Sequence, residues 1–196
     1  MARPRTFDET EVLDRAVQLF WTHGYDGTSI ADLEAATGLG RQSLYNTFGG
    51  KRELFVRALK HYHAQAADGR AKVEGAGLDA LSGFLGSTIG FMSETGERRG
   101  CFLTKARLES ADAEGVQPVC QLSESSIRRF IEGHLVEARE SGELRDGVVP
   151  HVAAGMLATW LHGLSAASAA GAEPNDLQRE ARLIIDGLRA WEAPDS

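Results

Sequence analysis

Five polar side chains between Arg41 and Asn46 could hydrogen-bond to a nucleic acid. They are Arg41, Gln42, Ser43, Tyr45 and Asn46. Arg, Gln, Ser and Asn side chains bind the edges of bases, and Tyr and Ser hydroxyls also reach phosphate oxygens. No acidic residue occurs from position 35 to position 52 that would repel phosphates. These residue types therefore predict a DNA-binding surface.

A short helix and a turn precede this stretch. Thr28 and Ser29 are residue types that cap helix N-termini, and we expect both to lie close enough to contact DNA. Apolar residues follow at three-residue steps on one helical face: Ile30, Leu33 and Ala36. Gly38 suits the left-handed conformation that ends such a helix.

A second helix over residues 41–48 would present the five polar side chains. Leu44 and Phe48 mark its buried side, which leaves the polar side chains facing outward. Two short helices joined by a glycine-containing turn form a helix-turn-helix, whose second helix enters the DNA major groove. An ordinary helical hairpin with a solvated face is the alternative interpretation.

The stretch from Thr28 to Lys51 resembles the DNA-binding domain of the TetR family of transcriptional repressors. That family has a helix of the type TSIADLEAATG, a recognition helix of the type SLYNTF, and then K-x-ELF. Matching positions here are Thr28, Ile30, Ala31, Leu33, Ala36, Gly38, Leu39, Leu44, Tyr45, Phe48, Lys51, Glu53, Leu54 and Phe55. Two departures are visible: Gly40 replaces a frequent serine cap, and Gly49-Gly50 replaces the polar cap before Lys51.

The resemblance implies an all-α protein with two parts. Residues 1–50 would form a three-helix DNA-binding domain, residues 51–67 a connector helix, and residues 68–196 a helical domain for effector binding and dimerisation. The resemblance also implies a ligand-responsive regulator that binds a near-palindromic operator in double-stranded DNA as a homodimer. We expect a repressor that a small, largely apolar effector releases, although the sequence leaves activation open.

Composition agrees with an all-helical fold, because Ala, Leu, Glu and Arg dominate and no run of alternating β-branched residues occurs. The net charge of −7 is uneven, since residues 1–60 hold eight basic and eight acidic residues. DNA affinity must then come from locally clustered cations: Arg3 and Arg5 in the tail, and Arg41, Lys51 and Arg52 near the recognition helix. We predict strongly salt-dependent binding that requires a dimer.

The chain carries two cysteines, Cys101 and Cys120, which form neither a disulfide framework nor a C-x-x-C motif. Its first residues lack the apolar core of a signal peptide, so we expect a cytoplasmic protein. The longest segment without Asp, Glu, Lys or Arg covers residues 147–172. It is rich in small residues, which favours burial against another helix over a membrane span.

Helical periodicity between residues 78 and 141 predicts apolar faces that carry an occasional hydroxyl group. The family resemblance implies that such faces enclose an effector site. The candidate ligand-binding residues are Tyr62, Phe84, Leu85, Thr88, Met92, Phe102, Cys120, Ser123, Ile127 and Trp160. A well-packed core without a cavity is the alternative.

Two further helices are predicted, one from Pro150 onward and one capped by Asn175 or Asp176. Each has an apolar face that needs a partner, and a twofold four-helix interface would cover both faces. The candidate dimerisation residues are Val152, Met156, Leu164, Ile184, Leu188 and Trp191. Packing within one chain is the alternative.

Other functional classes find less support in the sequence. No G-x-S-x-G elbow, phosphate-binding glycine loop or H-E-x-x-H motif occurs, so we expect no enzyme, cofactor or metal site. His61 and His63 would point about 200° apart on a helix. A helical ligand carrier without DNA binding stays open. Cys101 follows Arg98 and Arg99 at a possible helix start, which could activate its thiol. An inert, buried cysteine is the alternative.

Overall fold

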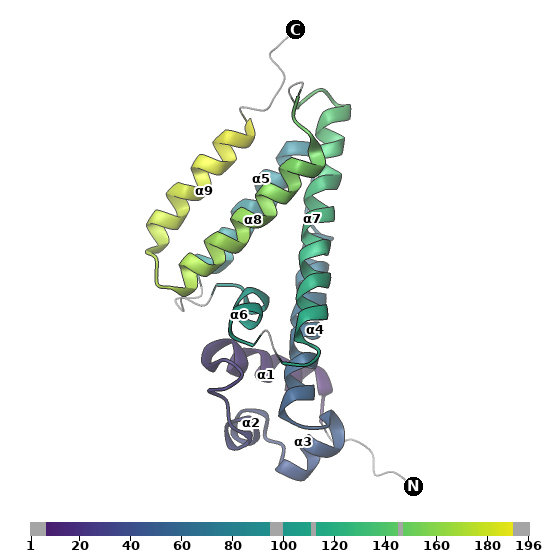
Figure 1. Cartoon of the computed structure of the whole chain (residues 1–196), viewed down its shortest axis with the longest axis vertical. Helices are drawn as coiled ribbons and strands as arrows, with labels where there is room; N and C mark the ends of the chain where they lie inside the picture. The colour runs from purple at the N-terminus through teal and green to yellow at the C-terminus, as the bar shows by residue number, and fades with distance from the viewer. Residues whose placement is uncertain (1–6, 95–99, 111–112, 145–146, 190–196) are drawn as a thin grey trace.

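The computed structural model describes residues 7–94, 100–110, 113–144 and 147–189, and these residues form helices without any strand (Figure 1). The predicted all-α fold is therefore confirmed. The helices are α1 Glu9–His23, α2 Ile30–Thr37, α3 Arg41–Phe48, α4 Lys51–Arg70, α5 Gly77–Glu94, α6 Phe102–Glu109, α7 Val116–Glu140, α8 Pro150–Ala169 and α9 Pro174–Arg189.

Several boundaries differ from the predicted ones. Helix α4 continues to Arg70, three residues beyond Ala67, because Arg70 buries its side chain and Gly69 is tolerated inside the last turn. Helix α7 begins at Val116, directly after Gly115, whose φ of 87° is left-handed. Helix α9 begins at Pro174, before the predicted caps, because proline's fixed φ suits the first helical position.

Capping interactions fix the ends of the first helices. Asp8 caps α1 by accepting a hydrogen bond of 2.8 Å from the backbone N–H of Thr10. Ser29 caps α2 in a reciprocal capping box with Asp32. Gly38 ends α2 with a φ of 72°, which few other residues adopt without strain. The chain therefore turns sharply between α2 and α3.

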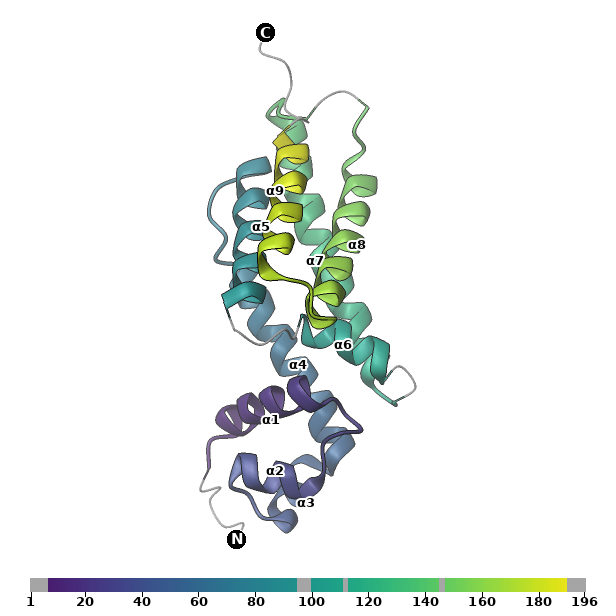
Figure 2. The same cartoon turned by 90° about the vertical axis from the view of Figure 1, so that its left-hand side faces the viewer.

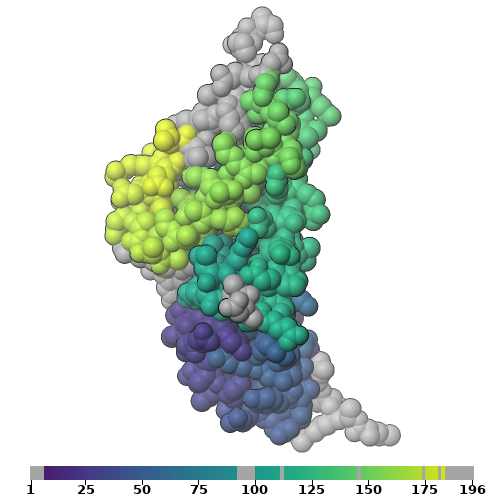
Figure 3. All heavy atoms as spheres, in the orientation of Figure 1, coloured from purple at the N-terminus to yellow at the C-terminus, as the bar shows by residue number. Residues whose placement is uncertain are grey.

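The core beneath α1 to α4 extends into the C-terminal half of the chain. Phe20 and Phe55 meet edge to face with ring centres 4.9 Å apart, and Phe55 contacts Phe102 of α6 at 5.8 Å. Buried residues of α6 and of the first turns of α7, such as Leu103 and Val119, belong to the same cluster. In Figure 3 the surface of α6 lies directly against that of α1. The two halves thus share one continuous core.

A second core lies between α5, α7 and α8, where Leu81, Ile131 and Leu157 are buried together. A smaller cluster of Ile89, Leu164 and Leu177 holds α9 against α5 and α8. The molecule is elongated, with α2 and α3 at one end and α9 toward the other (Figures 1 and 2). Helix α4 leads from the first end toward the C-terminal helices.

Candidate nucleic-acid interface and ligand cavity

The five side chains predicted on α3 are all exposed. The Gln42 Nε2 group donates a hydrogen bond of 2.9 Å to Asn46 Oδ1, and the Arg41 guanidinium lies 5.9 Å from the Tyr45 ring centre. Both contacts stay on the same helical face. These contacts order the exposed side chains of α3, and their remaining hydrogen-bond donors and acceptors face solvent.

Other helices hold α3 from behind. Gly40 supplies no capping side chain, but Glu34 of α2 accepts a hydrogen bond of 2.5 Å from the backbone N–H of Arg41. The negative charge of this carboxylate also interacts favourably with the positive, N-terminal end of the α3 helix dipole. On the opposite end, Arg57 of α4 lies 4.9 Å from the Phe48 ring centre and donates to the Thr47 carbonyl at 3.1 Å. The departure at Gly40 is therefore compensated from α2.

Two further predicted DNA-contacting residues lie beside α3. Ser29 is exposed, but its hydroxyl donates to Asp32 at 2.7 Å, so a phosphate would have to compete for that proton. Hydrogen bonds from the Ser29 hydroxyl and backbone lower the pKa of Asp32. Lys51 is half-buried, with its ammonium 4.4 Å from the Tyr25 ring centre. Arg3 and Arg5 lie outside the described residues.

Thr28 does not belong to this surface, and its predicted DNA contact is wrong. Its side chain is 1% exposed, and its hydroxyl donates a hydrogen bond of 2.7 Å to the carbonyl of Gly24. The sequence pattern suggested two neighbouring capping residues. Only Ser29 is the cap, while Thr28 closes the turn after α1.

A cavity of about 810 Å³ lies between α4, α5, α6, α7 and α8. Five of the predicted ligand-binding residues line it: Tyr62, Phe84, Thr88, Ser123 and Ile127. The Phe84 ring meets Phe130 at 4.9 Å between centres, which fixes one apolar wall. A cavity of this size with mixed polar and apolar walls accommodates a small organic molecule.

Three predicted ligand-binding residues are buried in the cores instead, and those predictions are wrong: Leu85 lies in the core of α5, α7 and α8, and Phe102 and Cys120 lie in the core beneath α1 to α4. Trp160 is partly buried against the core of α5, α7 and α8 and does not line the cavity, so its ligand contact stays a prediction. The Cys120 thiol donates to the Leu103 carbonyl at 3.6 Å, and burial raises its pKa. The side chain of Met92 lies outside the described part of the chain.

The cavity is also lined by polar residues outside the predicted ligand-binding set: Gln65, Arg70, Cys101, Thr104, His162 and Ser165. The hydroxyl of Thr104 lies 3.2 Å from His162 Nδ1. Burial lowers the pKa of His162, and its buried Nε2 atom has no hydrogen-bond partner among the described residues. Thr104 and His162 come from different helices, so spacing along the chain carries no signal for this pair.

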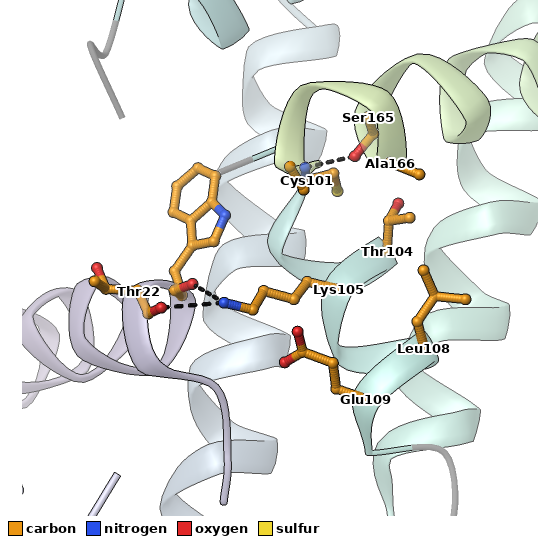
Figure 4. A pocket seen from close by; sticks show the side chains of 10 residues that line it. Thr22, Cys101, Thr104, Lys105, Leu108, Glu109, Ser165 and Ala166 are labelled. Carbon is orange, nitrogen blue, oxygen red and sulfur yellow. Dashed lines mark hydrogen bonds between the residues drawn. The ribbon is translucent and has the colours of Figure 1, made fainter. Parts of the chain in front are cut away.

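A second cavity of about 550 Å³ opens where α1, α6 and α8 meet (Figure 4). Lys105 of α6 donates hydrogen bonds to the carbonyls of Trp21 at 2.8 Å and Thr22 at 3.1 Å, in the last turn of α1. One turn earlier, the backbone N–H of Cys101 donates to Ser165 Oγ at 2.6 Å. Helix α6 is therefore bonded to α1 and to a wall of the larger cavity.

Helix α8 carries an exposed stripe. Val152 is 64% exposed and Met156 is 54% exposed, and Thr159 and Gly163 continue the same helical face. Leu164, by contrast, is 2% exposed and packs against Ile89 and Leu177 of its own subunit, so its predicted role in dimerisation is wrong. The side chains of Ile184 and Leu188, and all of Trp191, lie outside the described residues.

Neither a metal-binding cluster nor a membrane-spanning helix occurs in the described ranges. No three His, Cys, Asp or Glu side chains there are grouped so that they could hold a metal ion. None of the helices described is both long enough and apolar enough to cross a lipid bilayer.

Sequence comparison places the chain among known regulators. A family profile described as "Bacterial regulatory proteins, tetR family" matches residues 12–58, and one described as "Tetracyclin repressor-like, C-terminal domain" matches residues 77–184. The uncharacterized HTH-type transcriptional regulator YezE of Bacillus subtilis (strain 168) is 32% identical over 74% of this chain and 76% of that protein. The HTH-type transcriptional repressor ComR of Escherichia coli (strain K12) is 29% identical over 96% of this chain and 91% of that protein.

Solved structures agree along the whole chain. A cysteine mutant of the TetR family transcriptional regulator CifR, complexed with 26-bp double-strand operator DNA, is 28% identical, with a TM-score of 0.83. The match covers 97% of this chain and 100% of that one. The reduced form of NemR from E. coli has the same fold at 19% identity and a TM-score of 0.83 over 96% of this chain and 100% of that one. The chain belongs to the TetR family of bacterial transcriptional regulators.

Proposed function

We propose that this protein is a cytoplasmic repressor without catalytic activity, and that it binds a near-palindromic operator through α3. The exposed, polar and internally ordered face of α3 is the observation that carries this proposal. Gln42 and Asn46 would hydrogen-bond base edges, and Arg41 and Tyr45 would add base or phosphate contacts. The CifR regulator, which shares this fold, was solved on operator DNA.

Two protomers would bind one operator. The stripe of Val152, Met156, Thr159 and Gly163 on α8 suits a twofold interface, because its apolar end buries area and its small residues allow close approach. Leu183 of α9 is also exposed and would extend the interface. A twofold dimer presents two α3 helices to successive major grooves about 34–36 Å apart.

An effector in the larger cavity would release the operator by linkage. Tyr62 of α4 and Thr104 of α6 line that cavity, and the Tyr62 ring meets Trp21 of α1 edge to face at 5.2 Å. Lys105, one residue after Thr104, binds the last turn of α1. A ligand that shifts α4 and α6 would therefore change how the two α3 helices are spaced. Because binding is reciprocal, the effector and DNA would weaken each other.

A DNA-binding measurement tests this function. The duplex is the region upstream of the protein's own gene, labelled with a fluorophore, and binding is followed by anisotropy from low to high salt. We expect two protomers per duplex and an affinity that falls linearly on a log–log plot with salt concentration. Absence of binding at low salt would contradict the proposal.

Cys101 supports a second candidate, in which a reactive compound modifies the thiol and so releases DNA. The residue is the N-cap of α6, half-buried, lines both cavities, and lies 3.9 Å from the Tyr62 hydroxyl. A group added there would press on the start of α6. Treatment with N-ethylmaleimide should release the operator from wild type and not from Cys101→Ser. Equal responses would remove this candidate.

A further inference from the structure

Arg70 places a positive charge inside the larger cavity. It is the last residue of α4, its side chain is 8% exposed, and it lines the cavity wall. An arginine side chain stays protonated at any physiological pH, so the charge is permanent. Buried charges in proteins are ordinarily neutralised by a nearby opposite charge.

No such opposite charge meets Arg70 in the described part of the chain. Its one hydrogen bond there runs from Nη2 to the hydroxyl of Ser126 on α7, at 2.9 Å. Burial lowers the pKa of Arg70, which agrees with an uncompensated guanidinium. The α4 C-terminus offers only the partial negative charge of its last carbonyls. Most of the five guanidinium N–H groups therefore lack an acceptor among the described residues.

The space beside Arg70 has mainly apolar walls. Phe84 and Phe91 of α5 and Ile127 of α7 line it, together with Val73 just after α4. Lys72 and Glu74 also reach the cavity, but both are exposed and offset each other in charge. The cavity thus combines one buried cation with a body of apolar surface.

We propose that the effector is an amphiphilic anion, whose carboxylate binds the N–H groups of Arg70 that Ser126 leaves free and whose apolar body packs between Phe84, Phe91 and Ile127. This inference rests on the proposed role of the cavity as the effector site. Carboxylates match the planar fork of a guanidinium, and a charge-assisted pair in such surroundings discriminates strongly against neutral ligands.

Calorimetric titration of the full-length protein without DNA tests the inference. The probes are decanoate, 1-decanol and decylamine below their micellar concentrations, with 4-phenylbutyrate and 4-phenylbutanol as a second pair. We expect each acid to bind at least about tenfold more tightly than its alcohol, since hydrogen bonds to charged groups contribute that much. Decylamine should bind more weakly than 1-decanol. Equal affinity of acid and alcohol, or no binding of either acid, would overturn the inference.

Substitution of Arg70 identifies the residue responsible. Arg70→Met should lower the affinity for decanoate by at least about tenfold, to that for 1-decanol, while the affinity for 1-decanol changes less than about twofold. Its melting temperature should equal or exceed that of wild type, because an uncompensated buried charge is gone. Lys60→Met removes an exposed cation of the same helix that does not line the cavity, and should keep the preference for the acid within about twofold.

Two results would assign Arg70 a purely structural role. The first is that Arg70→Met still prefers decanoate over 1-decanol. The second is that wild type shows no such preference and Arg70→Met fails to fold. Arg70→Lys keeps the charge and should retain part of the preference if Arg70→Met does not fold. Operator binding is measured separately. If neutral compounds release the operator, the proposal of an anionic effector fails and the repressor function stands. If the acids bind but the protein does not bind the operator, the repressor function fails and the anion site stands.

Discussion

The face of α3 and the larger cavity are built in opposite ways. Five of the six positions from Arg41 to Asn46 supply the polar face, and the carboxylate of Glu34 on α2 supports its first turn. The cavity draws on five helices, and some of its polar groups bond one another, as Thr104 does His162 and Ser165 does Cys101. The open face is therefore suited to a large polar partner, and the cavity to a mainly apolar one.

Helix α6 connects these two regions. Its first turn lines the cavity, while Lys105 binds the last carbonyls of α1, beneath which α2 and α3 pack. A ligand enclosed by one region can thus change the placement of the other without touching it. The following predictions test whether the α3 face, the α8 stripe and α6 have these separate roles.

The largest effect is expected from separating the protomers. Val152→Glu combined with Met156→Glu places two charges in the α8 stripe and should give a monomer in analytical ultracentrifugation. Operator affinity should fall about 100-fold or more, because a monomer lacks the linked second α3 helix that binds the other half-site at high effective concentration. Leu122→Glu, on the exposed face of α7, is the matched control and should change neither property. A variant dimer with normal affinity would show that another surface joins the protomers.

Removal of the base-contacting groups should have the next largest effect. Gln42→Ala with Asn46→Ala deletes the bonded pair on α3, and each lost base contact should cost about 1–3 kcal/mol of binding free energy. Circular dichroism should be unchanged, because both side chains are exposed. Gln121→Ala on α7 provides a control of the same residue type. If the double variant bound the operator normally, α3 would not be the recognition helix.

Weakening of the contact between α6 and α1 should affect the release of the operator by effector more than operator binding itself. Lys105→Met removes the hydrogen bonds to Trp21 and Thr22, and the coupling between effector and operator should fall by about 0.5–2 kcal/mol. The measurement is operator affinity with and without a saturating effector. Lys60→Met, at an exposed position on α4, is the control. Unchanged coupling in Lys105→Met would mean that α4 alone transmits the change.

The smallest effect concerns the cap of α2. The pKa of Asp32 is lowered by hydrogen bonds from Ser29, so its folded value lies below its unfolded value of about 3.9. Its contribution is complete above the unfolded pKa and is lost as pH falls through the folded pKa. Asp32→Asn should therefore melt below wild type at pH 7, and the difference should shrink below about pH 4. A difference independent of pH would contradict this assignment.

The α3 region could be predicted because its determinants are local. The polar residues from Arg41 to Asn46 lie on one face of a single helix, and helical periodicity separates them from Leu44 and Phe48. The compensation at Gly40 was missed, because Glu34 lies on the preceding helix. Thr28 was misjudged because its residue type suits both a cap and a buried turn.

The cavity could be predicted only in part, because periodicity indicates that a face is buried without indicating what it meets. Phe84 and Leu85 are neighbours about 100° apart on α5, yet Phe84 lines the cavity and Leu85 packs in the core. Arg70 was not selected because the connector helix was predicted to end at residue 67, whereas α4 continues to Arg70. Leu164 was misplaced because burial by α9 and burial by a second protomer produce the same apolar pattern.

The most direct test of the central claim is a hydroxyl-radical footprint of wild type on the upstream duplex, paired with sedimentation of the complex. We predict two protomers per duplex and protection centred on two major grooves about one helical turn apart, lost in the Gln42→Ala, Asn46→Ala variant. A monomer that leaves the duplex unprotected, or a footprint that the double variant reproduces, would contradict the claim that paired α3 helices bind the operator.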